Sequence, residues 1–292
     1  MLLLSCDDIS WKEFIGFKSA IEILTQKKDP LKAVEARICA VEDAGLDSVG
    51  TTGYPDRDGN VTLDAGLMSG QNLLSAGVGC LQGYQHPFLV AQELWKQQKK
   101  GVTPHNYLVG IGANKFADSV QAKKANSSEK NKDDRSPLTH DTVGCISWDG
   151  QDQWFVGTST SGWGGKLPGR LGDSCTAGAG FCAFPKGAVF CTWTGEIATR
   201  FSLAARTAIY MEDGLSVDQA VNKALRVVAA INNGHKGPVI IHAASQEGCC
   251  VAGYGFEGGK IPATYTFWRD GMQEPVRRQV PLWNPDILAV AF

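Results

Sequence analysis

The sequence has little charge imbalance and no long apolar run. Among its 292 residues, 28 Lys and Arg nearly balance 30 Asp and Glu, which gives a formal net charge of −2. A chain this close to neutral lacks the basic surface that binding to nucleic acid or to an anionic membrane requires. No window approaches the roughly 18 consecutive apolar residues of a transmembrane helix. We therefore expect a small-molecule substrate or a protein partner, and neither nucleic acid nor membrane.

Cysteine and histidine patterns of metal-binding type are also missing. The nine cysteines are irregularly spaced and none forms a Cys-x-x-Cys pair, which gives no support to a zinc ribbon or a thioredoxin-like site. An odd number of scattered cysteines is typical of reduced, packed thiols. The histidines likewise lack metal-ligand spacing: His86, His105, His235 and His242. We expect no metal and no cofactor.

The N-terminal segment does not have the pattern of a secretory signal. Its apolar run, Leu2-Leu3-Leu4, is too short, and no basic region precedes it. We therefore expect a cytoplasmic protein, or a lysosomal or periplasmic one if a signal lies upstream of this chain.

Helical and strand patterns alternate along the chain. Asp29-Pro30 predicts a helix start, because it places an N-cap before a proline in the first turn. A second helix is expected over 197–211, and a third from Ser216, with Gln219 completing a capping box. Strands are expected over 143–148, 154–160 and 239–243. Paired strands and paired helices in this order predict an α+β fold in which helices cover two stacked sheets.

A polar, charged segment divides the chain. The composition changes at about residue 118 and stays polar to residue 140, and the stretch 121–135 is nearly free of apolar side chains, so burial cannot offset the entropy lost on ordering it. The composition predicts a mobile segment, and it ends directly before a strand that begins at Thr142.

Thr142 is a candidate nucleophile because of this position. A threonine hydroxyl needs a base beside it, and the α-amine of an N-terminal threonine, which titrates at about pH 8, can be that base. Attack of the Thr142 hydroxyl on the Asp141 carbonyl would move the acyl group from nitrogen to oxygen and free the amine, and water would then hydrolyse the resulting ester and cut the chain. The sequence therefore predicts a single domain, 1–292, that cleaves itself into a 1–141 α subunit and a 142–292 β subunit.

Three motifs follow one another closely from the predicted cleavage point. They are His140-Asp141-Thr142-Val143-Gly144, Gly157-Thr158-Ser159-Thr160-Ser161-Gly162 and Gly169-Arg170-Leu171-Gly172-Asp173-Ser174. With these motifs, and with Ser48-Val49-Gly50 and Leu63-Asp64-Ala65 in the first half, the chain resembles the glycosylasparaginase (aspartylglucosaminidase) family of N-terminal nucleophile hydrolases. The resemblance extends from about Lys18 to Gly255. It implies a four-layer αββα sandwich and αβ units that assemble as dimers.

The resemblance also implies roles for individual residues. Thr142 corresponds to the nucleophile, and Thr160 to a threonine whose hydroxyl is hydrogen-bonded to it. Arg170 corresponds to the residue that binds the substrate α-carboxylate, a task for which a bidentate guanidinium is suited. Asp173 corresponds to the acceptor of the substrate α-ammonium. The implied substrate site comprises Arg170, Leu171, Gly172, Asp173, Thr192, Trp193 and Gly195.

The oxyanion-binding segment departs from the family pattern. Family members have Thr-Gly-x-Gly-Asp where this chain reads Thr192-Trp193-Thr194-Gly195-Glu196. Aligned without gaps, Thr192 keeps the hydroxyl that stabilises the oxyanion and is a third catalytic residue, while Trp193 replaces a glycine. The Trp193 N–H can still donate, but its ring can fill substrate space and a positive φ would be costly. Pairing Thr194-Gly195 with Thr-Gly instead would need a deletion.

Three functions are compatible with these residues. The resemblance implies hydrolysis of N4-(β-N-acetylglucosaminyl)-L-asparagine to aspartate and a glycosylamine. The alternative is a β-aspartyl (isoaspartyl) peptidase or plant-type L-asparaginase, although the His140-Asp141-Thr142 junction favours the first activity over the second. A further alternative is a non-catalytic binding relative of the same fold, against which the intact Thr142, Arg170 and Asp173 argue.

Overall fold

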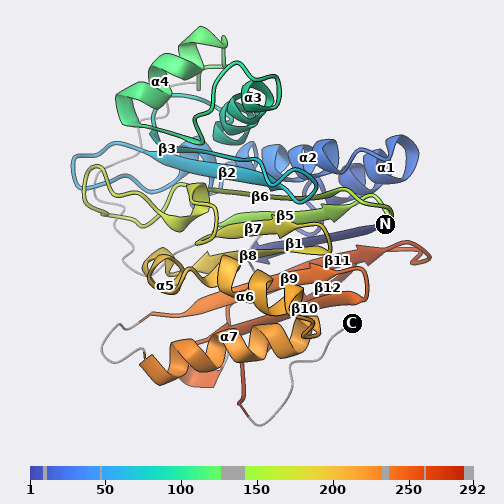
Figure 1. Ribbon diagram of the computed structural model, residues 1–292. Coiled ribbons are helices and arrows are strands. Elements are labelled where there is room, and N and C mark those ends of the chain that lie inside the picture. Colours follow the sequence, from blue (N-terminus) through green and yellow to red (C-terminus); the bar gives the residue numbers. More distant parts are fainter. Residues whose placement is uncertain (9–11, 47, 126–141, 232–236, 260, 286–292) are drawn as a thin grey trace.

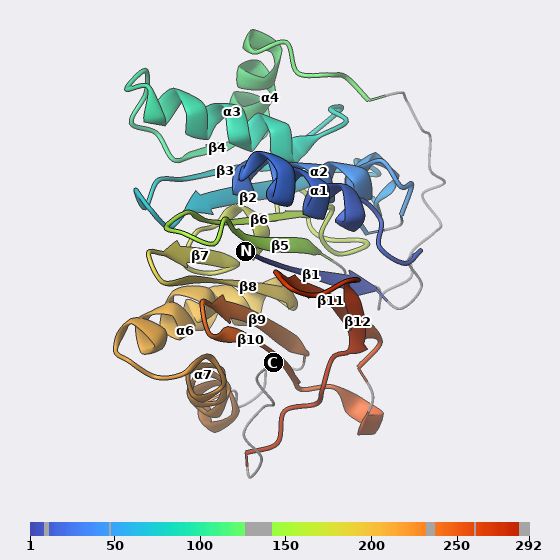
Figure 2. The ribbon, with the colours of Figure 1, turned by 90° about the vertical axis from the view of Figure 1, so that its right-hand side faces the viewer.

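Several strands are buried on both faces, as in β5 and β6, and such strands need cover on both sides. The computed structural model, which describes residues 1–8, 12–46, 48–125, 142–231, 237–259 and 261–285, supplies this cover as four layers. Two sheets stack face to face, and helices lie on the outer face of each (Figures 1 and 2). The α+β, αββα arrangement expected from the sequence is confirmed.

The larger sheet has eight strands in the order β12-β11-β1-β5-β6-β2-β3-β4. All neighbouring strands in it are antiparallel except β3 and β4. Its strands are β1 (Leu2–Asp8), β2 (Leu63–Ser69), β3 (Ser75–Leu81), β4 (Tyr107–Val109), β5 (Val143–Trp148), β6 (Trp154–Thr160), β11 (Ala263–Arg269) and β12 (Val276–Gln279). The order places β5 and β6, which carry the candidate threonines, in the middle of the sheet.

The smaller sheet has four antiparallel strands in the order β10-β9-β8-β7. Its strands are β7 (Phe181–Phe184), β8 (Gly187–Trp193), β9 (Val239–Ser245) and β10 (Gly248–Tyr254). The two sheets approach closely at Gly144 of β5, where an added Cβ would lie 2.3 Å from the ring of Phe190 on β8. Only glycine fits at this crossing.

Helices cover the two outer faces. The larger sheet packs against α1 (Phe17–Lys27), α2 (Pro30–Glu42), α3 (Pro87–Lys99) and α4 (Gly110–Ser119), and the smaller against α5 (Gly195–Phe201), α6 (Leu203–Glu212) and α7 (Val217–Ile231). Short 3₁₀ turns lie at η1 (Gly50–Thr52), η2 (Asp173–Cys175) and η3 (Glu257–Gly259). Three apolar clusters fill the spaces between these four layers.

Most of the expected elements occur at the expected residues. Strands β5 and β6 have the predicted bounds, and Asp29 caps α2 by accepting a hydrogen bond from the Lys32 N–H. The Gln219 side chain accepts from the Ser216 N–H at the start of α7, as a capping box requires. The helix expected over 197–211 is instead two helices, because Ser202 takes a left-handed φ of 47° between α5 and α6.

The polar segment differs in part from its expectation. Its described portion, 118–125, is held in place: Lys124 pairs with Asp118 at 2.6 Å and donates to the Tyr84 hydroxyl at 2.6 Å. The backbone N–H of Ala125 also bonds to the Gly83 carbonyl. Residues 126–141, including Asp141, lie outside the described residues.

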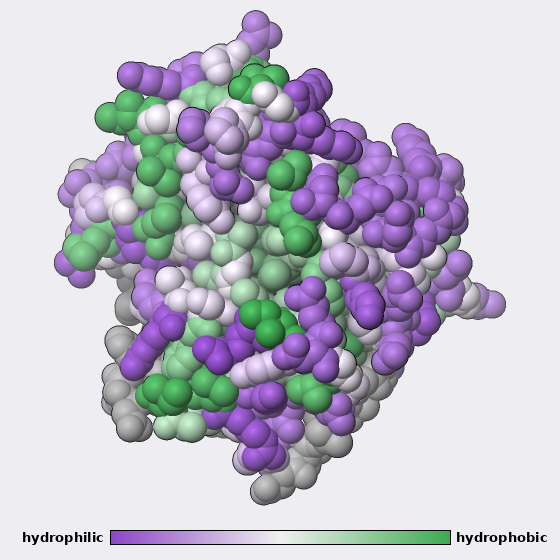
Figure 3. All heavy atoms as spheres, in the orientation of Figure 1, coloured by the Kyte–Doolittle hydropathy of each residue, from purple (hydrophilic) through white to green (hydrophobic). Residues whose placement is uncertain are grey.

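The surface is of mixed polarity. On the face in Figure 3, hydrophilic side chains crowd around α1 and α2, and paler or apolar ones gather over the middle of the sheets. All nine cysteines are free thiols. No helix in the described part of the chain is long and apolar enough to span a membrane.

Candidate active site

Thr142 and Thr160 end neighbouring strands in the middle of the larger sheet. In the ladder between β5 and β6, Val143 is paired with Ser159, so one step further along the same register sets Thr142 opposite Thr160. Both threonines are buried. The Thr160 hydroxyl also accepts a hydrogen bond from the Gly162 N–H at 2.9 Å, which fixes its orientation at the strand end. The two residues that the sequence paired are thus adjacent.

A cysteine that the sequence pattern does not single out holds the Thr142 backbone. The pairing of β1 with β5 ends at Ser5 and Cys145, and beyond it the Cys6 thiol bridges the two strands. The thiol donates to the Thr142 carbonyl at 2.9 Å and accepts from the Gly144 N–H at 3.0 Å. Cys6 therefore gives both of these backbone groups a hydrogen-bond partner beyond the last pair of the β1–β5 ladder.

A buried arginine fixes the strand that carries Cys6. Arg37 projects from α2, is fully buried, and forms an ion pair with Asp7. Its guanidinium also donates to the Cys6 carbonyl at 2.9 Å and to the Ser5 hydroxyl at 2.9 Å. Because the charge is paired and its donors are used, this arginine can anchor the end of β1 within the core.

Thr192 reaches the same edge from the smaller sheet. Strand β8 lies across β5, with Phe190 facing Gly144. The Gly66–Phe181 and Gly70–Phe184 approaches show that β2 and β7 run in the same direction. Since β5 is parallel to β2, and β8 antiparallel to β7, β5 and β8 run in opposite directions. Two residues before Gly144 and two after Phe190, the strands therefore bring Thr142 and Thr192 to one edge of the sandwich.

Asp173 is held beside these strand ends by the turn η2. The Thr158 hydroxyl on β6 donates to the carbonyl of Ser174 at 2.6 Å, which ties the turn to the strand that carries Thr160. Burial raises the pKa of the Asp173 carboxyl to about 7, while the positive charge of Arg170 opposes this rise. A nearby cation stabilises the ionised form of such a buried carboxyl, because the attraction offsets part of the hydration that the carboxylate has lost.

Arg170 converges on the same place. An added Cβ at Gly195, the first residue of α5, would lie 2.5 Å from Asp173 Oδ1 and 3.1 Å from Arg170 Nη2. The guanidinium donates through Nε and Nη2 to Glu196, at 3.0 and 2.9 Å, and its Nη1 atom lies beside Gly172. Gly195 is therefore small because two charged side chains need its space, and Glu196 orients the arginine.

Two further residues near the site have no role assigned from the sequence. Asp64, in the middle of the Leu63-Asp64-Ala65 motif, is buried and accepts from the N–H groups of Gly172 and Cys80, at 2.8 and 2.9 Å. Lys166 is also buried, and its ammonium donates to the carbonyls of Thr62 and Ser161, at 2.9 and 2.5 Å. Burial lowers the pKa of Lys166. Both residues brace the loop that presents Arg170 and Asp173.

A surface cleft opens onto this loop. It has a volume of about 510 Å³ and is lined by Arg170, Glu196, Lys166, Trp163 and Arg57. Leu171 lies half-exposed between the two charged substrate-site candidates. The structure thus gathers Thr142, Thr160, Arg170, Leu171, Gly172, Asp173, Thr192, Trp193 and Gly195 at one edge of the sandwich, whereas Asp141 lies outside the described residues.

Comparison with known proteins gives this arrangement a family. The family model described as Asparaginase matches residues 15–137 and 121–258. An N(4)-(β-N-acetylglucosaminyl)-L-asparaginase of Elizabethkingia miricola is 35% identical over 234 residues, 74% of this chain and 67% of its own. The chain belongs to the asparaginase family.

Other members of the asparaginase family are named for different activities. A plant-type L-asparaginase of Pyrococcus horikoshii is 27% identical over 294 residues, covering 91% of this chain and 88% of its own. An isoaspartyl peptidase/L-asparaginase of Bos taurus is 27% identical over 242 residues, 77% of each chain. Membership makes this chain an amidohydrolase with the N-terminal nucleophile hydrolase fold.

Trp193 is the chain's departure from the family pattern, and its backbone has the conformation that a glycine adopts easily. Its φ is +82°, in a region that bulky side chains rarely enter. Its ring packs edge-on against Phe256, with the centroids 4.8 Å apart. Such a backbone costs on the order of 1–3 kcal/mol, so the packing around it must hold it there.

Proposed function

We propose that this chain cleaves itself before Thr142 and then hydrolyses the side-chain amide of a substituted asparagine, N4-(β-N-acetylglucosaminyl)-L-asparagine. The observation that carries the proposal is the convergence of Arg170 and Asp173 on Gly195, at the sandwich edge where Thr142 and Thr192 meet. One basic and one acidic side chain side by side match the α-carboxylate and α-ammonium of a free amino-acid end. That match supports an asparagine derivative rather than an internal residue of a protein.

The reaction needs only groups of this chain and water. The Thr142 hydroxyl adds to the substrate amide carbonyl, and the α-amine of the cleaved chain accepts the hydroxyl proton. The Thr192 hydroxyl and the Trp193 N–H stabilise the oxyanion. Collapse expels the amine with that proton and leaves an aspartyl ester on Thr142. Water then hydrolyses the ester, releases aspartate and restores the hydroxyl.

The preferred amide rests on two supports. The free amino-acid end is matched by Arg170 and Asp173, and the Elizabethkingia miricola relative, at 35% identity, is named for the glycosylated substrate. The Pyrococcus horikoshii and Bos taurus relatives are each at 27% identity. The range of activities among these relatives keeps isoaspartyl peptides and free asparagine as the second candidate. A dimer of αβ units in the cytoplasm is part of the proposal, with aspartate and a glycosylamine as products.

Self-cleavage is tested by denaturing electrophoresis of the purified protein. We expect two bands that divide the chain near its middle, and N-terminal sequencing of the C-terminal fragment should begin at Thr142. The Thr142→Ala variant should give one band and no hydrolysis, because it lacks the hydroxyl that attacks in both steps. Thr142→Ser is the matched control, since serine keeps a hydroxyl and should still be cleaved. A wild-type protein that stays uncleaved after long incubation would contradict the proposed mechanism, because the α-amine of Thr142 would not be formed.

Substrate choice is tested separately on the cleaved protein. Glycosylasparagine, asparagine and an isoaspartyl dipeptide are compared by kcat/KM at one pH. The proposal expects the largest value for glycosylasparagine. Activity on the isoaspartyl dipeptide alone would reject this substrate while leaving self-cleavage intact.

A further inference from the structure

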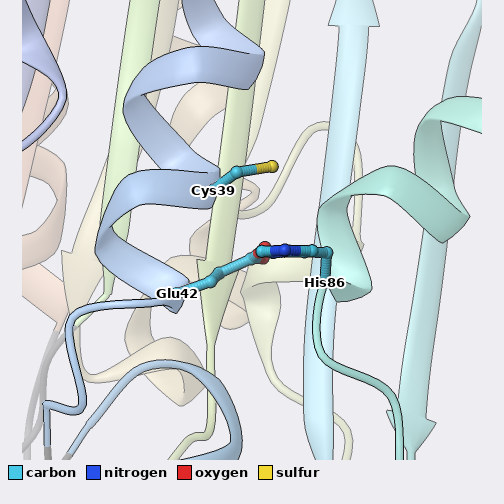
Figure 4. A group of neighbouring side chains, drawn as sticks. All are labelled: Cys39, Glu42 and His86. Carbon is cyan, nitrogen blue, oxygen red and sulfur yellow. The ribbon is translucent and has the colours of Figure 1, made fainter. Parts of the chain in front are cut away.

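A second cluster of reactive side chains joins α2 to α3, away from the residues assigned above. Cys39 and Glu42 lie one helical turn apart near the end of α2, and His86 immediately precedes α3 (Figure 4). Each offers one possible metal-ligand atom, and these three atoms all lie within 4.8 Å of one another. Sulfur, imidazole nitrogen and carboxylate oxygen together suit zinc and similar divalent transition metals.

Glu42 is held so that one oxygen is directed at the cluster. Its Oε1 accepts hydrogen bonds from the Phe88 N–H at 3.2 Å and from the Ser159 hydroxyl at 2.7 Å. Its Oε2 faces His86 Nδ1 at 3.1 Å. The carboxylate is fully buried. Two donors therefore fix the orientation of the carboxylate before any ion arrives, as a preorganised ligand needs.

His86 has the second contact that metal-binding histidines usually have. Its Nε2 lies 3.5 Å from Asp43 Oδ1, which also accepts a hydrogen bond from Gln85 at 2.6 Å. A proton on Nε2 directed at Asp43 leaves the lone pair of Nδ1 facing Glu42 and Cys39. This carboxylate–histidine arrangement orients the ring and raises its basicity towards a metal.

We propose that Cys39, Glu42 and His86 bind one zinc ion, or a similar divalent transition metal, that clamps α2 to α3. One thiolate, one carboxylate and a neutral imidazole together offset the two charges of the ion, so the buried site is electrically neutral. Binding displaces the Cys39 thiol proton and the proton held between Glu42 and His86. Tetrahedral zinc needs ligand atoms about 3.3–3.8 Å apart, so the cluster must close by at most about 1.5 Å.

The surroundings of the cluster are of mixed charge and open to solvent. Glu35, one turn before Cys39, and Asp43 act electrostatically on Cys39, and Lys32 acts on it with the opposite sign. A cleft of about 340 Å³ is lined by His86 and Glu35 and opens beside the cluster, with room for a water molecule as fourth ligand. The spacing of the three residues does not match a known metal-binding motif, because two of them lie one helical turn apart and the third follows 44 residues after Glu42. The sequence alone therefore does not predict the site.

Zinc binding to the purified protein tests the proposal. After dialysis against a chelator, the wild type should bind one equivalent of Zn²⁺ by calorimetry, and its melting temperature should rise by several degrees. Cys39→Ser and His86→Gln should weaken binding by more than about 100-fold, and Asp43→Asn by about 10- to 100-fold. Cys182→Ser and His105→Gln are matched controls outside the cluster and should bind like the wild type.

A spectrum of the wild type gives a second measurement that does not depend on whether a variant folds. Co²⁺ in the site should give a thiolate-to-cobalt absorption band, which equimolar Zn²⁺ abolishes. Absence of that band, or a Cys39→Ser variant that binds zinc as tightly as the wild type, overturns the proposal and leaves a purely structural Glu42–His86 pair. Neither result affects self-cleavage at Thr142, because the two tests have separate readouts.

Discussion

Two buried titratable groups in this sandwich, Asp173 and His242, differ in whether they change charge near neutral pH. Asp173 lies at the edge of the sheets, where Arg170 is close and a cleft opens beside the arginine, and its pKa is about 7. His242 lies in β9, between the sheets, with its ring stacked on Phe190 at 4.2 Å. Burial lowers the pKa of His242 to about 3, opposed by a polar contact with the Phe190 backbone.

The difference shows what burial does with and without a route to solvent or charge. Apart from this weak contact with the Phe190 backbone, the described residues offer the ring nitrogens of His242 no hydrogen bond, and burial keeps the imidazole neutral above about pH 3. Asp173 instead titrates close to neutrality, where a small change in its surroundings changes its charge. Asp173 at the edge of the sheets can therefore change its charge when a ligand binds. His242 between the sheets keeps its charge state and affects only the stability of the fold.

The largest effect is expected at the edge, from Asp173→Asn. Loss of the charge proposed to meet the substrate ammonium should raise the activation barrier by about 2–5 kcal/mol, which lowers kcat/KM by about 30- to 5,000-fold, mainly through KM. In the wild type the carboxylate is ionised only above about pH 7, so kcat/KM should fall as pH drops below that value. The measurement is a pH–rate profile of both proteins, in which the variant should lack this limb.

Asp173→Asn should lower activity but raise the free energy of unfolding. The folded-state pKa of Asp173 is raised from 3.8, so folding binds a proton more tightly and the wild type loses stability as pH rises from about 4 to 7. Asp173→Asn removes that loss and should raise the free energy of unfolding at pH 8, and much less at pH 4. Equal effects at both pH values would show that the carboxyl is not shifted.

Cys6→Ala tests whether the edge depends on the bridge between β1 and β5. The variant leaves the Thr142 carbonyl and the Gly144 N–H without the thiol that satisfies them, at a cost of about 1–3 kcal/mol in the free energy of unfolding. The Thr142 carbonyl loses the contact that holds it, so the proposed self-cleavage should slow more than unfolding alone explains. Time courses on gels measure this, and Cys6→Ser, which keeps a donor and an acceptor, should recover most of the rate.

Sequence reasoning predicted the strands and the class of enzyme but not the contacts that support the site. Strands were expected over 143–148 and 154–160, and β5 and β6 have these bounds, whereas the roles of Thr142, Arg170 and Asp173 were implied by the family resemblance and stay predictions. The role of Cys6 could not be predicted, because its partners lie more than 130 positions away in the sequence and only the register of β1 against β5 brings them together.

Local geometry also escaped the sequence. The break between α5 and α6 follows from the left-handed backbone conformation of Ser202, and the periodicity of apolar residues does not predict such a conformation. Glu196 and Lys166 look like ordinary surface charges in the sequence, yet one holds Arg170 and the other is buried among carbonyls. Such roles depend on tertiary contacts that no spacing rule encodes.

His242→Phe tests the interior half of the comparison. An unfolded histidine takes up a proton near its ordinary pKa of 6.5, whereas the folded one stays neutral to about pH 3, so the wild type loses stability as pH falls below 6.5. Between pH 7 and pH 5 this loss amounts to about 1–2 kcal/mol, and the phenylalanine variant should escape it. Denaturant melts at both pH values measure it, while kcat/KM should stay unchanged because the ring does not belong to the site.

Trp193→Gly should give the smallest change in stability and the most specific change in activity. Glycine relieves the +82° backbone, which gains about 1–3 kcal/mol. Against this gain stand the lost edge-on contact with Phe256, worth about 0.5–1.5 kcal/mol, and the greater freedom of glycine in the unfolded chain, worth about 0.4–1 kcal/mol. The gain and the two losses nearly cancel in the free energy of unfolding. The backbone N–H survives, so turnover of asparagine should change less than about threefold. If the ring borders the leaving group, the ratio of kcat/KM for glycosylasparagine to that for asparagine should shift, and an unchanged ratio would show that Trp193 serves the packing against Phe256 alone.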